Sequence, residues 1–502
     1  MNINRRGFLF GSTAAAALAG CSTAKVGRRE LKPGEKLNFA MIGVGQMGRG
    51  NLGTFLGNDK VNVVAVCDVD KERLADAKGR VDARYKNTNC RAVSDFREIV
   101  NDPTIDIVGV CTPDHWHAYI AVEAMKHGKD VFCEKPLTFT IAEARTVMEV
   151  QRKYGRVFQT NAWQRSWDLF WTAVMIVRNG CLGKVRYVDA NYGIGGAKRG
   201  GPSHPIRFFD EPEKAATEGA PNPNVDWNMW LGPAKWRPYS DQLAPRGVHK
   251  FFPMFWRFDD DFGTGYNGDW GAHHLDIAQW GMDMDESGPY KIICSDEPHS
   301  TNLFHGCRRQ FGMRMLFKKD YGDIELYHGP FGVWGTVFYC DNGIVAVNRG
   351  KIAVWEGTGL VKPTKEIRKA LQNVSFMPEK IVAESVGKDY GTDTNVKKDD
   401  RLKTAMAKLN EKYDLAHARV QLFKAKKGHI GDFVESCYTR EPTISPSYVG
   451  GRTAILCGLC NLSYVHDTGF DWDPVKNDFA NGTGHGIALA RTDCRNGWEV
   501  KA

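Results

Sequence analysis

The sequence predicts an α/β protein in which an N-terminal, doubly wound parallel sheet is followed by a C-terminal α+β domain with a large mixed, mostly antiparallel open sheet. The chain has 502 residues, more than one hydrophobic core usually holds. Between Lys36 and Thr160, short apolar runs alternate with helical patterns, which is typical of βαβ units. After Asn161, strand-like runs are separated by short polar turns.

The strands of the first domain are expected in continuous apolar runs, because parallel strands are buried on both faces. Between them, segments such as 71–80 and 117–127 have the amphipathic spacing of helices. The runs are residues 37–44, 61–67, 105–111, 130–133 and 157–160. We therefore assign residues 36–160 to the first domain and residues 161–502 to the second.

The second domain is expected to begin with a helix at residues 167–178 and a strand at residues 184–192. Residues 193–226 are rich in Gly and Pro and are long enough to form a functional lid. Further strands are expected at residues 291–294, 313–317, 323–328, 337–340 and 344–348. A solvated Lys-rich helix is expected over residues 397–427, and a last apolar helix at about 451–465.

The N-terminus predicts export. Arg5 and Arg6 form a twin-arginine pair, and the apolar stretch 12–20 that follows is too short to span a bilayer, which takes ~20 residues. Residues 18–21 resemble a lipobox, so residues 1–21 are expected to be a signal peptide, Cys21 the lipidated residue and residues 22–35 a tether. The protein is then a lipoprotein on the periplasmic side, and the lipid anchor is its only membrane contact.

The charge and the cysteines exclude other classes. The net charge of +8 is spread over basic residues interleaved with acids, so no nucleic-acid-binding face is expected. Twin-arginine signals export folded proteins, and the 13 cysteines therefore predict no disulfide framework. Cys457 and Cys460 form a C-x-x-C within an apolar helical stretch, which favours core packing over metal or redox chemistry.

A glycine motif predicts a dinucleotide site. Gly43, Gly45 and Gly48 form G-x-G-x-x-G, with an apolar strand before it and a helical segment after it. In this context the glycines allow a tight turn, a close approach of a pyrophosphate and close packing of helix on strand. Asp68 ends the next strand, where a carboxylate hydrogen-bonds ribose hydroxyls and disfavours the extra phosphate of NADP. We therefore expect NAD in preference to NADP, and the predicted export of a folded protein implies that it is tightly bound.

Three further motifs resemble the Gfo/Idh/MocA oxidoreductase family, over roughly residues 37–473. They are C-T-P-D-H-W-H at 111–117, E-K-P at 134–136 and D-W-G-A-H-H-L-D at 269–276. The segments D-W-N-M-W-L-G-P at 226–233 and 269–280 resemble the exported bacterial branch. An open sheet face in the second domain often serves assembly in this family, so a homo-oligomer is possible.

The resemblance implies roles for individual residues. Lys135 matches the catalytic lysine of E-K-P, and Asp269 and His273 match the D-x-x-x-H pair. Asp276 matches a further acid after the histidine, and we expect it near the substrate. The cofactor is expected to contact Gly43, Gly45, Gln46, Met47, Gly48, Asp68, Thr112, Pro113, His115, His117, Glu134, Lys135 and Pro136.

The chemistry agrees with these roles. Oxidation of a secondary alcohol requires removal of the hydroxyl proton, and a histidine with a pKa near ~6.5 can accept it. An acid four residues away can orient that histidine on one helical turn. We therefore expect His273 to be the general base, Asp269 its partner and Lys135 a proton-sharing group, although Lys135 could itself be the base.

Other side chains are candidates for the walls of the site. Trp163, Gln164 and Arg165 follow the last strand of the first domain, and these residues, with Trp256 and Arg257, could face the substrate or be structural. His115 and His117 are two residues apart on a turn, which favours walls of the cofactor pocket over a metal pair. No metal site is expected.

These features predict an NAD-dependent oxidoreductase that transfers a hydride between nicotinamide and a secondary alcohol carbon of a sugar or glycoside. One alternative is an NAD-dependent glycosidase that oxidises a ring carbon transiently and recycles the cofactor. The sequence W-Q-R-S at 163–166 lacks the acid expected of such enzymes. A second alternative is a non-catalytic carbohydrate-binding lipoprotein, since fold does not fix function.

Overall fold

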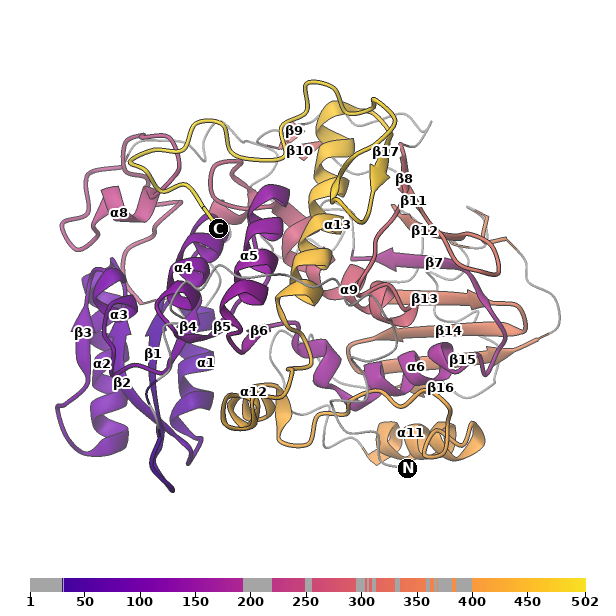
Figure 1. Cartoon of the computed structure of the whole chain (residues 1–502), viewed down its shortest axis with the longest axis horizontal. Coiled ribbons are helices and arrows are strands. Elements are labelled where there is room, and N and C mark those ends of the chain that lie inside the picture. Colours follow the sequence, from indigo (N-terminus) through magenta and orange to yellow (C-terminus); the bar gives the residue numbers. More distant parts are fainter. Residues whose placement is uncertain are drawn as a thin grey trace, which may run out of the picture.

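The computed structural model describes residues 29, 31–192, 219–248, 255–294, 303–304, 307–308, 313–329, 335–357, 362–364, 368, 382–384 and 400–502. These residues form a parallel, doubly wound domain and a second domain built on a large mixed sheet, so the predicted fold class is confirmed (Figure 1). Among the described helices, none is both long and apolar enough to cross a membrane.

The first sheet has six strands in the order β3-β2-β1-β4-β5-β6, and all its pairs are parallel. The strands are β1 (Leu37–Ile42), β2 (Val61–Cys67), β3 (Arg91–Val93), β4 (Ile107–Val110), β5 (Asp130–Cys133) and β6 (Phe158–Thr160). The helices are α1 (Gln46–Leu56), α2 (Lys71–Tyr85), α3 (Arg97–Val100), α4 (Asp114–Lys126) and α5 (Ile141–Tyr154). The order reverses between β1 and β4, where such folds bind ligands at the carboxyl ends of the strands.

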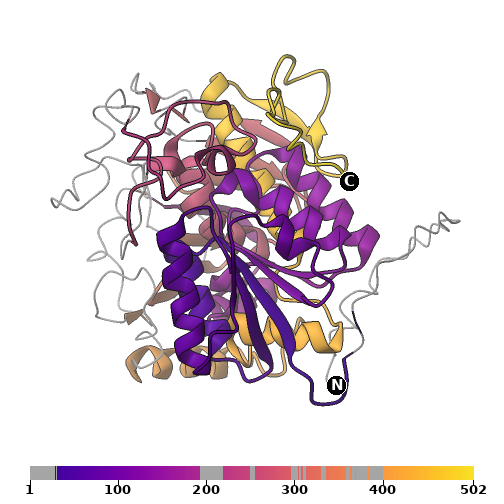
Figure 2. The same cartoon turned by 90° about the vertical axis from the view of Figure 1, so that its left-hand side faces the viewer.

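Helices cover both faces of this sheet, as Figure 2 shows from the side of the first domain. Apolar residues of α1 and α2 pack on one face, together with Phe433 and Val434 of the distant helix α12 (Gly428–Thr439). Apolar residues of α4 and α5 pack on the other face, in the core that continues into the second domain. Residues of the second domain therefore join the apolar packing on both faces of the first sheet.

The second sheet has ten strands in the order β16-β15-β14-β13-β7-β12-β11-β8-β17-β18. Only β7 with β12 is a parallel pair among them. The strands are β7 (Val185–Asn191), β8 (Lys291–Ile293), β11 (Met313–Phe317), β12 (Ile324–His328), β13 (Gly335–Cys340), β14 (Gly343–Asn348), β15 (Lys351–Glu356), β16 (Val382–Glu384), β17 (Phe470–Asp473) and β18 (Asp478–Phe479). A separate pair is formed by β9 (Leu303–Phe304) and β10 (Cys307–Arg308).

Three helices join this sheet to the first domain. α6 (Asp168–Arg178) and α9 (Ala272–Gly281) lie against the sheet, and α13 (Ser447–His466) packs on both α9 and α5. The described part of the Lys-rich segment forms α11 (Asp400–Lys412), and residues 415–427 form no helix. The predicted helix over 397–427 is therefore too long at its C-terminal end.

The segment 219–248 lies against the first domain. Val225 pairs with Asp70 in an isolated bridge, and Arg73 of α2 donates to the carbonyl of Pro245 at 2.7 Å. This segment includes the short helix α8 (Trp227–Leu231). The first part of the predicted lid, residues 193–218, lies outside the described residues.

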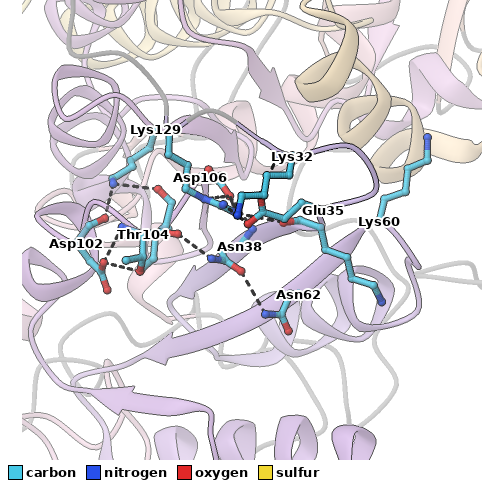
Figure 3. Close-up of polar contacts among 12 residues, drawn as sticks. Lys32, Glu35, Asn38, Lys60, Asn62, Asp102, Thr104, Asp106 and Lys129 are labelled. Carbon is cyan, nitrogen blue, oxygen red and sulfur yellow. Dashed lines mark hydrogen bonds and ion pairs between the residues drawn. The ribbon is translucent and has the colours of Figure 1, made fainter.

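The end of the predicted tether contacts the body. Arg29 forms an ion pair with Asp106 at 2.9 Å, and Asp106 also accepts a hydrogen bond from the backbone N–H of Asn38 at 2.8 Å. Figure 3 shows Glu35, Asn38 and Asp106 in this cluster, at the edge of the sheet where β1 begins. The predicted signal peptide, with Arg5, Arg6 and Cys21, lies outside the described residues.

Candidate functional site

One cleft of about 1260 Å³ runs along the carboxyl edge of the first sheet and continues between the two domains. Most of the residues predicted for the site line it. They are Gly43, Gly45, Gln46, Met47, Asp68, Thr112, Pro113, His117, Glu134, Lys135, Pro136, Trp163, Trp256, Arg257, Asp269 and His273. His115, Arg165 and Asp276 do not line this cleft, and Gly48 lies beneath it.

The glycine loop has the geometry of a dinucleotide cradle. Gly43 has a φ of +81°, and a Cβ at Gly48 would lie 2.0 Å from the carbonyl oxygen of Gly43, so neither position tolerates a side chain. A Cβ at Gly45 would meet nothing within 4 Å, so the cleft is open beside it. No side chain caps the N-terminus of α1, which begins here. These features fit a pyrophosphate bound at a helix N-terminus.

Two polar groups beside the loop fit the same ligand. The hydroxyl of Thr112 is buried and has no hydrogen-bond partner among the described residues, although it lies at the cleft wall. Asp68 accepts hydrogen bonds from the backbone N–H groups of Val44 at 2.8 Å and Asp70 at 3.0 Å, which fix its carboxylate at the end of β2. Burial raises the pKa of Asp68. The arrangement fits a dinucleotide with its ribose near Asp68.

Lys135 and Asp269 meet across the domain boundary. The Lys135 Nζ lies 2.5 Å from Asp269 Oδ1 and donates to the backbone carbonyl of Asp269 at 2.8 Å. The Arg257 Nε lies 3.6 Å from the same carboxylate oxygen. Burial alone would raise the pKa of Asp269, but the two cations lower it below its usual range. Asp269 is therefore a carboxylate that holds Lys135 at the cleft wall.

The predicted orientation of His273 by Asp269 is wrong, because the two side chains form no hydrogen bond. Residues Asn267–Gly271 form a π-helix before α9, so residues four apart are not stacked as on an α-helix. His273 Nδ1 is buried without a partner among the described residues, and its ring lies 6.2 Å from that of Trp163 and 5.8 Å from that of Trp270. Burial lowers the pKa of His273 well below its usual range, and the nearby cations Arg349 and Lys135 lower it further.

The E-K-P segment is held from both sides. The side chain of Glu134 accepts hydrogen bonds from Asn51 at 2.8 Å and Asn161 at 2.7 Å. The His117 ring lies between two backbone carbonyls, 2.7 Å from that of Pro136 and 2.8 Å from that of Thr112. These contacts join the ends of β4, β5 and β6 and fix the position from which Lys135 projects.

The predictions for Arg165 and Asp276 as substrate contacts are corrected. Arg165 is 1% exposed and bonds Asp276 with two nitrogens, each at 2.8 Å. It bonds Asp285 in the same way, each contact at 2.7 Å. Thr453 of α13 donates to Asp276 at 3.0 Å. These residues form a closed ionic network beneath the cleft, and all the described polar atoms of Arg165 are engaged in it.

The prediction that His115 lines the cofactor pocket is also corrected. The His115 ring does not line the cleft, and it contacts the backbone carbonyls of Phe262 at 3.3 Å and Trp230 at 3.0 Å. Burial lowers its pKa to about 3. His115 therefore joins α4 to the segments around α8 and residue 262.

Arg349 is a cleft residue that the sequence did not indicate. It lies in the turn between β14 and β15, and its guanidinium is stacked between Trp163 at 4.8 Å and Trp270 at 4.5 Å. Its Nε donates to Gln164 at 2.9 Å. Burial lowers its pKa to about 10. The local sequence, an Asn-Arg-Gly turn, predicts a hairpin but no role in the cleft. The two tryptophans that contact Arg349 come from distant segments of the chain, so no local pattern indicates them.

The chain matches models of one oxidoreductase family in both domains. Residues 37–162 match the NAD-binding Rossmann fold of the Gfo/Idh/MocA oxidoreductase family, and residues 208–314 match the C-terminal α/β domain of that family. The first domain is thus an NAD-binding Rossmann domain. The two matches together cover less than half of the chain, and they show that both parts are similar to the Gfo/Idh/MocA oxidoreductases.

The curated relatives act on polyols and glycosides. Inositol 2-dehydrogenase of Salmonella typhimurium is 31% identical over 133 residues, 26% of this chain and 38% of that protein. An α-N-acetylgalactosaminidase of Shewanella oneidensis is 28% identical over 219 residues, 38% of this chain and 46% of that protein. Each match covers less than half of the relative.

Solved structures share the fold over most of the chain. The WlbA dehydrogenase of Bordetella pertussis, in complex with NADH and UDP-GlcNAcA, has a TM-score of 0.52 and 12% identity, covering 88% of this chain and 99% of that one. An aldose–aldose oxidoreductase of Caulobacter crescentus has a TM-score of 0.51 and 14% identity, covering 87% of this chain and 100% of that one. At such low identity they show the two-domain fold alone.

Proposed function

We propose that this protein is an NAD-dependent oxidoreductase that transfers a hydride between nicotinamide and a secondary alcohol carbon of a sugar or glycoside. The observation that carries the proposal is the single cleft that holds both the glycine cradle and the group of Lys135, Asp269 and His273. A cofactor lying from Asp68 toward Pro136 would bring its reactive ring to that group. Dehydrogenases of polyols among the relatives support this reaction class.

His273 and Lys135 have separate roles in the proposed alcohol oxidation. Bound NAD supplies the hydride acceptor. His273 is neutral at neutral pH because its pKa is lowered, so it can accept the hydroxyl proton. Lys135, held by Asp269, donates a hydrogen bond to the substrate oxygen and stabilises the negative charge that develops there. The side chains of Lys135 and Asp269 are 14% and 17% exposed, and this partial burial strengthens the contact.

The test is the variant Lys135→Met, assayed with a panel of sugars and methyl glycosides. We expect the rate of bound-NADH formation to fall about 10²–10⁴-fold, because one charged donor to the reacting oxygen is removed. NAD affinity, measured by calorimetry, should stay within about threefold. Lys78→Met is the control, since Lys78 pairs with Asp82 on α2, away from the cleft. A wild-type protein that binds no NAD would refute the proposal, and so would full turnover by Lys135→Met.

An NAD-dependent glycosidase is the second candidate. The match to the α-N-acetylgalactosaminidase extends over 219 residues, further along the chain than the 133 residues matched to inositol 2-dehydrogenase. Such an enzyme releases free sugar from an aryl glycoside with catalytic NAD and no net NADH. Stable NADH and ketosugar, without release of the aglycone, would exclude it.

We further propose that the cofactor stays bound through export by the twin-arginine route, and that Cys21 is lipidated. Mass spectrometry of protein from the membrane fraction should find a diacylglyceryl group on an N-terminal Cys21 and one nucleotide for each chain. Cys21→Ser should release the protein from the membrane without loss of the nucleotide. We also propose a homo-oligomer through the second domain, which light scattering of the purified protein tests.

A further inference from the structure

The cleft does not end at the residues proposed for hydride transfer. Beyond Trp163 it continues along a wall formed by the start of α6, one face of α11 and the loop before α12. Leu402, Lys403 and Met406 of α11 line this part together, as residues one turn apart on a helix do. Trp167 lines it from the other side.

The aromatic and aliphatic part of this distal wall is held in place. The rings of Trp163 and Trp167 meet edge to face with centroids 4.3 Å apart, which gives a continuous aromatic surface from the reaction centre outward. The side chains of Trp167 and Met406 are each partly exposed to the cleft. Below them, Ser166 Oγ lies 2.8 Å from His429 Nδ1, which ties the start of α6 to α12. The apolar surface is therefore preformed.

The size of the cleft leaves room for an occupant here. At about 1260 Å³ the cleft exceeds the ~300–1000 Å³ typical of pockets for one small ligand. The cofactor fills the part beside the glycine loop, and a sugar ring fills the part beside Lys135 and His273. The remaining wall has the aromatic and aliphatic side chains of Trp167, Leu402 and Met406, and polar or charged side chains also line it: Asp168, Lys403, Lys426, Lys427 and His429.

We propose that this distal wall, defined by Trp163, Trp167 and Met406, binds the apolar aromatic aglycone of a glycoside whose sugar ring is oxidised at Lys135 and His273. The inference rests on the proposed function and narrows its substrate class to aryl glycosides. Aromatic rings stack well against indole and thioether groups, whereas a methyl aglycone or a free sugar would leave the wall in contact with water.

The experiment compares 4-nitrophenyl and methyl glycosides of the same sugars, using protein loaded with NAD. The single-turnover rate of NADH formation is followed at each substrate concentration. The wild type should favour the aryl glycoside by at least about tenfold in kcat/KM. Met406→Gln should lose about 5–10-fold with the aryl glycoside and change little with the methyl glycoside, since only the first contacts residue 406.

Two further variants complete the test. Ala407→Gln changes an exposed neighbour on α11 that does not line the cleft, and both rates should stay as in the wild type. Met406→Trp fills the distal wall and should exclude the aryl glycoside while keeping the methyl glycoside. Equal rates for the two glycosides in the wild type, or equal losses for both in the Met406 variants, would overturn the inference. Absence of NADH with every substrate would instead overturn the proposed function.

Discussion

Removal of the buried guanidinium of Arg165 is expected to destabilise the fold without touching the reaction. Arg165→Met leaves Asp276, 1% exposed, and the partly buried Asp285 without the cation that both carboxylates contact. Burial alone would lower the pKa of Arg165, but the two carboxylates raise it, so the charged form is strongly favoured. Loss of one partner from such a buried pair costs about 3–5 kcal/mol of unfolding free energy.

The assay is thermal unfolding followed by circular dichroism. We expect the melting temperature to fall by roughly 3–5 °C for Arg165→Met, because a chain of this length has a large entropy of unfolding. Arg165→Met/Asp276→Asn should recover part of the loss, because the most deeply buried charge is then neutral. Arg80→Met is the matched control, since its ion pair with Asp76 is 46% and 29% exposed and should contribute less than about 1 kcal/mol. An Arg165→Met protein with unchanged stability and a raised KM would refute the structural role of Arg165. It would instead support the sequence prediction that Arg165 contacts the substrate.

The remaining predictions concern the glycine loop and pH. Gly48→Ala should weaken NAD binding at least about tenfold in calorimetry, because its Cβ would lie 2.0 Å from the Gly43 carbonyl oxygen. Gly53→Ala on the same helix is the control: its Cβ meets no atom within 4 Å, so this variant should bind NAD as the wild type does. Burial lowers the pKa of His429 to about 4, so its neutral ring contributes stability above the unfolded pKa of ~6.5 and loses it as pH falls toward 4. Between pH 7 and 5 the wild type should therefore lose about 2 kcal/mol more unfolding free energy in urea than His429→Gln does; equal losses would contradict this.

The first domain could be predicted because its signals are local. Each of its long strands is a continuous apolar run, and the turn after β1 carries its own glycines. β3 was not predicted because it has only three residues, too few for a period to appear. The start of α13 was placed at residue 451 instead of Ser447, since paired glycines disfavour a helix. A Cβ at Gly450 would lie 2.0 Å from Thr160 Oγ1, so tertiary packing overrides that propensity.

The position of a site residue could be predicted only where that residue and its neighbours in the cleft belong to motifs at the ends of adjacent strands. Thr112, Pro113 and the E-K-P residues follow strands that end at one edge, so their place in the cleft follows from the order of the sheet. Arg349 and Met406 reach the cleft from a hairpin and a helix far along the chain, and neither has a local signature. Arg165 was wrongly predicted to contact the substrate because it lies close to Trp163 in the sequence. That proximity gives no information on the direction of its side chain.

The charges around His273 bear on the choice between the two candidate bases. Lys135 Nζ lies 2.5 Å from Asp269 Oδ1, so the lysine is held in place as a hydrogen-bond donor. His273 has no such partner at Nδ1 among the described residues, and Arg349 and Lys135 both oppose its protonation. The neutral imidazole has a nitrogen that can accept the hydroxyl proton while Lys135 donates to the oxygen, although the cations that keep the imidazole neutral also weaken it as a base. We therefore infer that His273 is the base and that Asp269 acts on Lys135 and not on the histidine.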